Sequence, residues 1–210
     1  MTTIRHPEWI TPSVNGEPHF GYDQEWYPQK RQKLAGCGPT VGAMTVAYLQ
    51  RKHNGISVAT RDAAEKIMLR IWKYATPRMH GLYKPRWLGE GLNGYFRDEN
   101  LPFRAEVLSV SSVRLLAPPL DKVKAFIEEG IRADAPVAFL NLHSGGEPIP
   151  YHWHWMLLVR VEEKDGRILC TLWDEGKEYV FDLKSWLSKT KFGGGFVRIC
   201  LLYTSPSPRD

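Results

Sequence analysis

Three residues that are far apart in this 210-residue chain, Cys37, His154 and Asp174, are of the types that cooperate in thiol catalysis. Cys37 lies between Gly36 and Gly38, directly before an amphipathic helical pattern. At a helix N-terminus, unpaired N–H groups and the helix dipole stabilise a thiolate. The glycines leave a substrate free to approach the sulfur. A small buried cysteine at the start of a core helix would give the same local pattern, so the hypothesis depends on partners elsewhere in the chain.

A nucleophilic thiol needs a base and a group that orients the base. His154 opens a strongly apolar strand pattern, and Asp174 ends the next strand pattern. The Lys-Asp-Gly stretch at 164–166 predicts a hairpin between the two strands, which would bring positions 154 and 174 together at its open end. We therefore predict that His154 is the base and that Asp174 orients it.

An oxyanion also needs hydrogen-bond donors, and the Cys37 N–H can supply one of them. A side-chain amide could supply the second. Gln32 and Gln29 both lie shortly before Cys37, and Gln24 is a third candidate.

Three short motifs together resemble a known family: Gly-Cys-Gly-Pro-Thr at 36–40, His-Trp at 154–155 and Asp-Glu-Gly at 174–176. They are similar to motifs of papain-like cysteine peptidases, in the stand-alone branch of the bacteriocin-processing (double-glycine) superfamily. The resemblance covers residues 24–49 and 136–182, which is under half of the chain.

The resemblance implies a papain-like α+β fold and a catalytic triad. It places the nucleophile at Cys37, the base at His154 and the orienting carboxylate at Asp174. Family members carry a glutamine five or six residues before the cysteine, which favours Gln32 over Gln29.

The residues around the triad are candidates for substrate contact. His152 and His154 alternate along one predicted strand and would face the same side. Such a pair could hold zinc together with Cys37 or Asp174, but neither a CxxC nor an HExxH pattern accompanies it, so we predict no metal and no cofactor. Cys170 lies in an apolar strand and is predicted to be a packing residue. The predicted substrate-binding residues are Gly36, Gly38, His152, Trp153 and Trp155.

The periodicity of apolar residues predicts the elements that position these groups. The first 35 residues, rich in Pro, Gly and aromatic side chains, are predicted to be an extended arm with short strands. Helices are predicted from Cys37 onward and over 60–74, 88–98, 118–133 and 184–187. Strands are predicted over 101–110, 135–142, 152–163, 167–174, 177–183 and from residue 195. Helices that precede antiparallel strands indicate an α+β domain.

Composition excludes several classes of protein. With 43% hydrophobic and 12% aromatic residues the chain can bury a full core as one globular domain. The net charge is +5, and the Lys and Arg residues are scattered among Asp and Glu without forming a basic block, which argues against nucleic-acid binding. An odd count of three cysteines argues against a disulfide framework. Neither a signal peptide nor a membrane span is evident in the sequence, so we expect a cytoplasmic protein that does not bind membranes.

The last eleven residues, 200–210, read CLLYTSPSPRD. This string is the translation of an adapter used in transposase-based DNA library preparation. We therefore predict a single domain over residues 1–199 and treat residues 200–210 as sequencing read-through that is not native.

These observations predict a cysteine peptidase-like hydrolase that cleaves a peptide or a small amide. Two alternatives stay open. The same triad could transfer the acyl group to an amine or a thiol, or the cleft could bind a peptide without cutting it.

Overall fold

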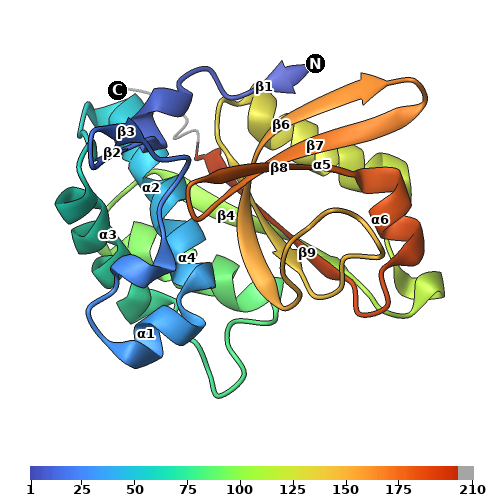
Figure 1. Ribbon diagram of the computed structural model, residues 1–210, viewed down its shortest axis with the longest axis horizontal. Coiled ribbons are helices and arrows are strands. Elements are labelled where there is room, and N and C mark those ends of the chain that lie inside the picture. Colours follow the sequence, from blue (N-terminus) through green and yellow to red (C-terminus); the bar gives the residue numbers. More distant parts are fainter. Residues whose placement is uncertain (203–210) are drawn as a thin grey trace, which may run out of the picture.

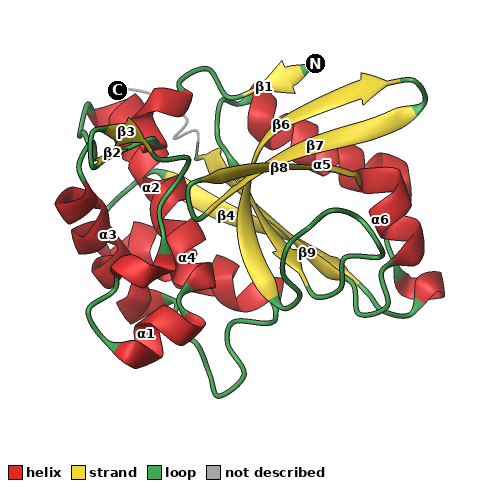
Figure 2. Ribbon diagram, viewed as in Figure 1, coloured by secondary structure: helices red, strands yellow, loops and turns green. Residues whose placement is uncertain are grey.

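The computed structural model describes residues 1–202 and places an antiparallel sheet between two groups of helices. Figure 1 shows helices α1 to α4 gathered on the left and α5 and α6 on the right. The strands of the main sheet, which are yellow in Figure 2, run between the two groups. The bounds of the α-helices are α1 (Lys30–Ala35), α2 (Cys37–Asn54), α3 (Arg61–Tyr74), α4 (Pro85–Asp98), α5 (Leu120–Arg132) and α6 (Leu183–Lys189).

The main sheet has seven strands in the described residues, and its neighbours follow the order β4, β9, β5, β6, β7, β8, with β1 pairing to β6. All of these pairs are antiparallel. The strands are β1 (Thr2–Thr3), β4 (Phe103–Val110), β5 (Val137–Asn141), β6 (His154–Lys164), β7 (Arg167–Asp174), β8 (Lys177–Asp182) and β9 (Gly194–Leu201). A small separate sheet pairs β2 (Ser13–Val14) with β3 (Glu17–Pro18). Three short 3₁₀ turns complete the elements: η1 (Pro7–Ile10), η2 (Gln24–Trp26) and η3 (Arg114–Leu116).

Helix α2 lies in the core, and every residue from Gly38 to Leu49 is buried. Such a helix owes its stability to packing on all sides more than to an amphipathic face. It ends at Asn54, and the φ of 70° at the following Gly55 turns the chain so that the Ile56 N–H bonds the carbonyl of Gln50 at 3.4 Å. The core therefore holds the cysteine-bearing end of α2 in a fixed position.

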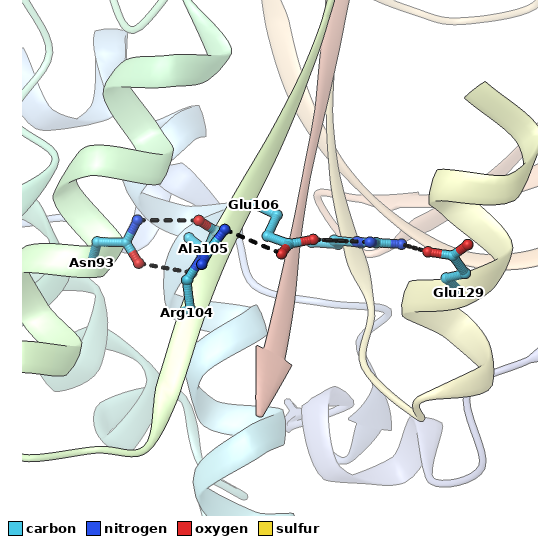
Figure 3. Close-up of polar contacts among 6 residues, drawn as sticks. Asn93, Arg104, Ala105, Glu106 and Glu129 are labelled. Atoms are coloured by element: carbon cyan, nitrogen blue, oxygen red, sulfur yellow. Dashed lines mark hydrogen bonds and ion pairs between the residues drawn. The ribbon is translucent and has the colours of Figure 1, made fainter. Parts of the chain in front are cut away.

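Polar contacts tie the flanking helices to the sheet. The Asn93 amide of α4 bonds the N–H and the carbonyl of Ala105 in β4, at 2.8 and 3.1 Å. On the next strand, Arg198 bonds Glu106 at 2.8 Å and also bonds Glu129 of α5 (Figure 3). Pairing with Arg198 lowers the pKa of the Glu106 carboxyl. These contacts join β4 and β9 to helices on both sides.

The α+β class is confirmed, and the predicted helices and strands from residue 37 onward all form. The prediction for the first 35 residues is wrong in one place, because α1 forms over Lys30–Ala35. Two side chains cap this helix. The Gln32 side-chain oxygen accepts from the backbone N–H of Gln29, and the Gln29 side chain accepts from the backbone N–H of Gln32. A pattern of apolar residues cannot reveal so short a helix.

The last strand extends two residues past the predicted domain boundary at residue 199. β9 continues through Cys200 and Leu201, which pair with Arg104 and Phe103 of β4. The rest of the segment assigned to read-through, from residue 203 onward, lies outside the described residues. Within residues 1–202, no helix has the length and apolar character needed to cross a bilayer.

Candidate active site

Cys37 is the first residue of α2 and is partly exposed. Its N–H and that of Gly38 find no carbonyl earlier in the helix, and among the described residues neither N–H is paired. The first backbone bond of the helix runs from the Thr40 N–H to the Gly36 carbonyl. The sulfur therefore stands beside two free N–H donors at the positive end of an 18-residue helix.

His154 and Asp174 form a buried pair. The His154 Nε2 lies 2.9 and 3.0 Å from the two carboxylate oxygens of Asp174. With Nε2 occupied, Nδ1 is the ring nitrogen that remains for Cys37. Burial alone would lower the pKa of His154, but hydrogen bonds to Asp174 and to Cys37 outweigh burial and raise this pKa to about 10. The structure therefore brings together residues 37, 154 and 174.

The hairpin between β6 and β7 explains why His154 meets Asp174. It turns at Asp165 and Gly166, whose φ angles of 51° and 72° fit the tight turn that the sequence predicts. The pairing register is shifted by an irregularity between Leu158 and Arg160. Beyond this shift Leu157 pairs with Trp173, so His154 and Asp174 are diagonal neighbours at the open end of the hairpin.

The residues next to the pair have unusual backbone conformations. Trp153, directly before His154, has a φ of 56°, and Glu175, directly after Asp174, has a φ of 48°. A left-handed conformation costs a bulky residue about 1–2 kcal/mol. The surrounding structure maintains this conformation on both sides of the His154–Asp174 pair, as is common where a fold positions functional groups.

Buried side chains hold the loop that leads into β6. Asn141, which is opposite His154 in the sheet, donates to the carbonyl of Tyr151 at 2.8 Å. The oxygen of Asn141 accepts from the indole N–H of Trp186 at 3.0 Å. The ring of Tyr151 packs edge-on against His154 with 5.1 Å between centroids. Asn141, Tyr151 and Trp186 therefore position the imidazole, although no motif identified them in the sequence.

Gln32 is the glutamine that the structure favours. It is 6% exposed and lies in α1, which ends one residue before the Gly36 that precedes Cys37. Its oxygen accepts from the Gln29 N–H at 3.3 Å, and its NH₂ group has no partner among the described residues. Gln29 is exposed, and the Gln24 oxygen is buried and unpaired. Gln32 is therefore the candidate with a fixed carboxamide and a free donor.

The prediction that His152 lies on the same strand face as His154 is wrong. β6 begins only at His154, and the left-handed Trp153 breaks the alternation before it. His152 is exposed, stacks on His143 with 4.9 Å between centroids, and lies 3.2 Å from the Ser144 hydroxyl. It therefore belongs to the loop before β6, and its role as a substrate-binding residue stays a prediction.

The two tryptophans beside His154 have different environments. Trp155 is 1% exposed, its indole donates to the Leu82 carbonyl at 2.6 Å, and its ring lies against Gly38. Its prediction as a substrate-binding residue is therefore wrong, because protein atoms enclose it. Trp153 is 52% exposed and lines a groove, so it stays a candidate for substrate contact. Gly36 and Gly38 are buried, and packing fills the space where their side chains would be.

Glu175 is a neighbour of the site that sequence reasoning missed. An oxygen of its carboxylate lies within 4.8 Å of ligand atoms of both His154 and Asp174. Burial, together with the charge of Asp174, raises the pKa of Glu175. These three residues could in principle coordinate a metal, but an ion on the Nε2 of His154 would have to break its bonds to Asp174. In the sequence, only its position directly after Asp174 indicated that Glu175 lies near the site.

Replacement of Gly36 by alanine is expected to destabilise the protein by roughly 1–3 kcal/mol. The new Cβ would lie 2.4 Å from the Gln32 carbonyl oxygen and 2.6 Å from the Tyr27 ring, so α1 would have to move away from α2. Urea unfolding followed by circular dichroism measures the change. Gly94→Ala is the matched control, because its Cβ would meet its nearest atom at 3.4 Å. Equal shifts of the two midpoints would contradict this account of Gly36.

No family model matches the sequence, and no curated protein is significantly similar to it.

Proposed function

We propose that this chain is a cysteine hydrolase that cleaves a peptide bond or a small amide through a thioester intermediate. The observation that carries the proposal is the meeting of Cys37 with the His154–Asp174 pair. These residues come from a helix N-terminus and a hairpin more than 100 positions away. Their order of contact, from thiol to imidazole to carboxylate, is the order that nucleophilic catalysis needs.

The arrangement also supports a papain-like fold as part of the proposal. The cysteine opens a buried helix, and the histidine and aspartate lie on neighbouring strands of an antiparallel sheet against which this helix packs. A glutamine with a free amide lies just before the cysteine. These features agree with what the resemblance to the double-glycine peptidases implies.

The first half of the reaction forms the thioester. The Cys37 thiol gives its proton to the His154 Nδ1, the sulfur attacks the carbonyl carbon, and one electron pair of the C=O bond moves to the oxygen. The N–H of Cys37 and the amide of Gln32 are the donors available to this oxyanion. When the intermediate collapses, the C–N bond breaks and the proton on the His154 Nδ1 passes to the departing nitrogen.

The second half regenerates the enzyme. Water attacks the thioester carbon while the His154 Nδ1 takes one of its protons. The C–S bond then breaks, which releases a carboxylic acid and leaves a thiolate beside an imidazolium. Asp174 accepts from Nε2 throughout and keeps the ring in the orientation that points Nδ1 at the sulfur.

Limited alkylation with iodoacetamide across pH 5–9 tests the proposal without a known substrate. Cys37 should react at least about 10-fold faster than either other cysteine near pH 6, because its sulfur is partly exposed at a helix N-terminus beside the His154 imidazole. Burial raises the pKa of both Cys170 and Cys200, so they serve as internal controls. Mass spectrometry of tryptic peptides gives the rate at each thiol.

The outcome separates the proposed hydrolase from a protein that only binds peptides. If Cys37 reacts as slowly as Cys200 at every pH, the thiol is not activated and the hydrolase proposal fails. If Cys37 reacts fast, addition of an amine acceptor to a cleaved peptide distinguishes hydrolysis from acyl transfer by the product mass.

A further inference from the structure

A groove of about 720 Å³ lies between α1 and the loop that joins α3 to α4, outside the triad itself. One wall comes from α1 and the other from the loop, and one exposed aromatic ring from the segment before β6 completes it. The lining residues used below are Lys30, Arg31, Leu34, Arg78, Met79 and Trp153. We refer to this feature as the α1 groove.

The α1 groove is continuous with the candidate active site along the chain. Ala35 lines it and is followed at once by Gly36 and Cys37. Trp153 lines it and directly precedes His154. On the loop side, Leu82 approaches within 3.2 Å of the place where a side chain on Gly38 would begin. The groove and the candidate active site therefore share two chain segments, the one that leads into Cys37 and the one that leads into His154.

The α1 groove is positively charged. Lys30, Arg31 and Arg78 all line it, whereas acidic residues are missing from the described lining. None of the ion pairs between residues 1–202 includes these three cations. Arg31 donates to the Pro77 carbonyl at 3.4 Å, and the Arg78 guanidinium lies 4.0 Å from the ring centroid of Trp87. Both contacts leave the positive charge uncompensated.

Negative charge lies close to the triad at residues that do not line the α1 groove. Glu175 follows Asp174, and the charge of Asp23 contributes to raising the pKa of Glu175. An acidic peptide segment is therefore attracted to the cations of the α1 groove and repelled by the carboxylate of Glu175.

Exposed apolar side chains lie among the cations of the α1 groove. Leu34 is 76% exposed and Met79 is 91% exposed, and Trp153, the residue before His154, lines the same groove. Together they offer apolar contact area beside charged donors. An adaptable methionine and a flat indole suit side chains of a peptide in extended conformation.

We propose that the α1 groove binds an acidic segment of the substrate next to the bond that is cleaved. Carboxylates of the segment pair with Arg31, Arg78 and Lys30, and its apolar side chains lie on Leu34, Met79 and Trp153. This inference rests on the proposed function for the position of the scissile bond. The same cations bind a side-chain carboxylate or the carboxylate at the end of a peptide, because both present two oxygens to a guanidinium.

Fluorescence anisotropy with the Cys37→Ala protein tests the α1 groove separately from the chemistry. The probes are fluorescein-labelled octapeptides with five leucine or alanine positions and three variable positions. Three probes carry Glu, Gln or Lys at these positions and end in an amide. A fourth carries Gln and ends in a free carboxylate, which separates the two sources of the anion.

The Glu probe should bind at least about 10-fold more tightly than the Gln probe. Each exposed ion pair contributes little to the binding free energy, but several of them together give this difference. The difference should shrink as salt is raised, because salt screens exposed charges. Arg31→Glu combined with Arg78→Glu should remove the preference for Glu and favour the Lys probe. Lys30→Glu changes only α1 and is expected to weaken the preference for the Glu probe. It serves as a second variant if the double substitution perturbs folding.

Arg86→Glu combined with Arg97→Glu is the matched control, because both arginines are exposed on α4 and neither lines the α1 groove. Equal binding of the Glu and Gln probes would overturn the proposal, and so would an equal loss in the control variant. Because no bond is cleaved in this measurement, its failure is distinct from slow alkylation of Cys37, which would instead overturn the hydrolase proposal.

Discussion

Replacement of Cys37 by alanine is expected to reduce peptide cleavage by at least about 10³-fold, because the sulfur is the only group placed to form the covalent intermediate. No other described side chain lies at the start of α2 with an imidazole beside it. The measurement compares the two proteins on a synthetic peptide library that is rich in Asp and Glu. New termini are identified by mass spectrometry.

Cys170→Ala is the control for this experiment. Cys170 lies in β7, is fully buried and has a pKa raised by burial, so its thiol takes no part in the proposed reaction. We expect this variant to retain cleavage at temperatures where it stays folded. If Cys37→Ala cleaves the same bonds at the rate of the unmodified chain, Cys37 is not the nucleophile.

The substitution His154→Ala is expected to reduce cleavage nearly as much as Cys37→Ala. The thiol and the imidazole act as one unit, so the loss of either one removes most of the activity. His154 also sets the pH dependence. Hydrogen bonds to Asp174 and Cys37 raise its pKa to about 10 in spite of burial, so the imidazolium that protonates the leaving nitrogen persists well above the ordinary histidine range. Activity should therefore fall on the basic side only as pH approaches this value.

Asp174→Asn provides the sharper test of that pH dependence. The amide removes one of the two contacts that raise the pKa of His154, so the basic limb should move toward neutral pH. A remnant of activity, reduced by about 10²–10⁴-fold, should persist because the thiol and imidazole are still present. A basic limb near pH 6.5 in the unmodified protein would contradict the account, and so would a limb that does not move in Asp174→Asn.

Local signals in the sequence were sufficient for most of the secondary structure. The apolar periodicity of α3 and α5 and the alternation of β6 and β7 follow from the side of each element that must be buried. The Asp-Gly turn at 165–166 forms because both residues tolerate a positive φ. Because this turn sets the hairpin, the sequence also predicted that His154 and Asp174 meet.

Other features depend on contacts between distant segments. α1 is six residues long and is stabilised by its own side-chain caps and by packing against η2. The spacing of apolar residues therefore did not predict it. The left-handed Trp153 breaks the strand before His154, so His152 lies in the preceding loop and not on the strand face of His154. Trp155 looked available in the sequence, yet Leu82 and Gly38 enclose it.

The sequence by itself determined the residue types, the helix that Cys37 begins and the hairpin that carries His154 and Asp174, because propensity and turn chemistry act over a few residues. Only the tertiary structure decided that the thiol faces the imidazole, that the amide of Gln32 is free, and that cations from α1 and from the loop after α3 share one groove. These are outcomes of how the buried α2 packs on the sheet, and packing between elements depends on all the side chains of both surfaces at once.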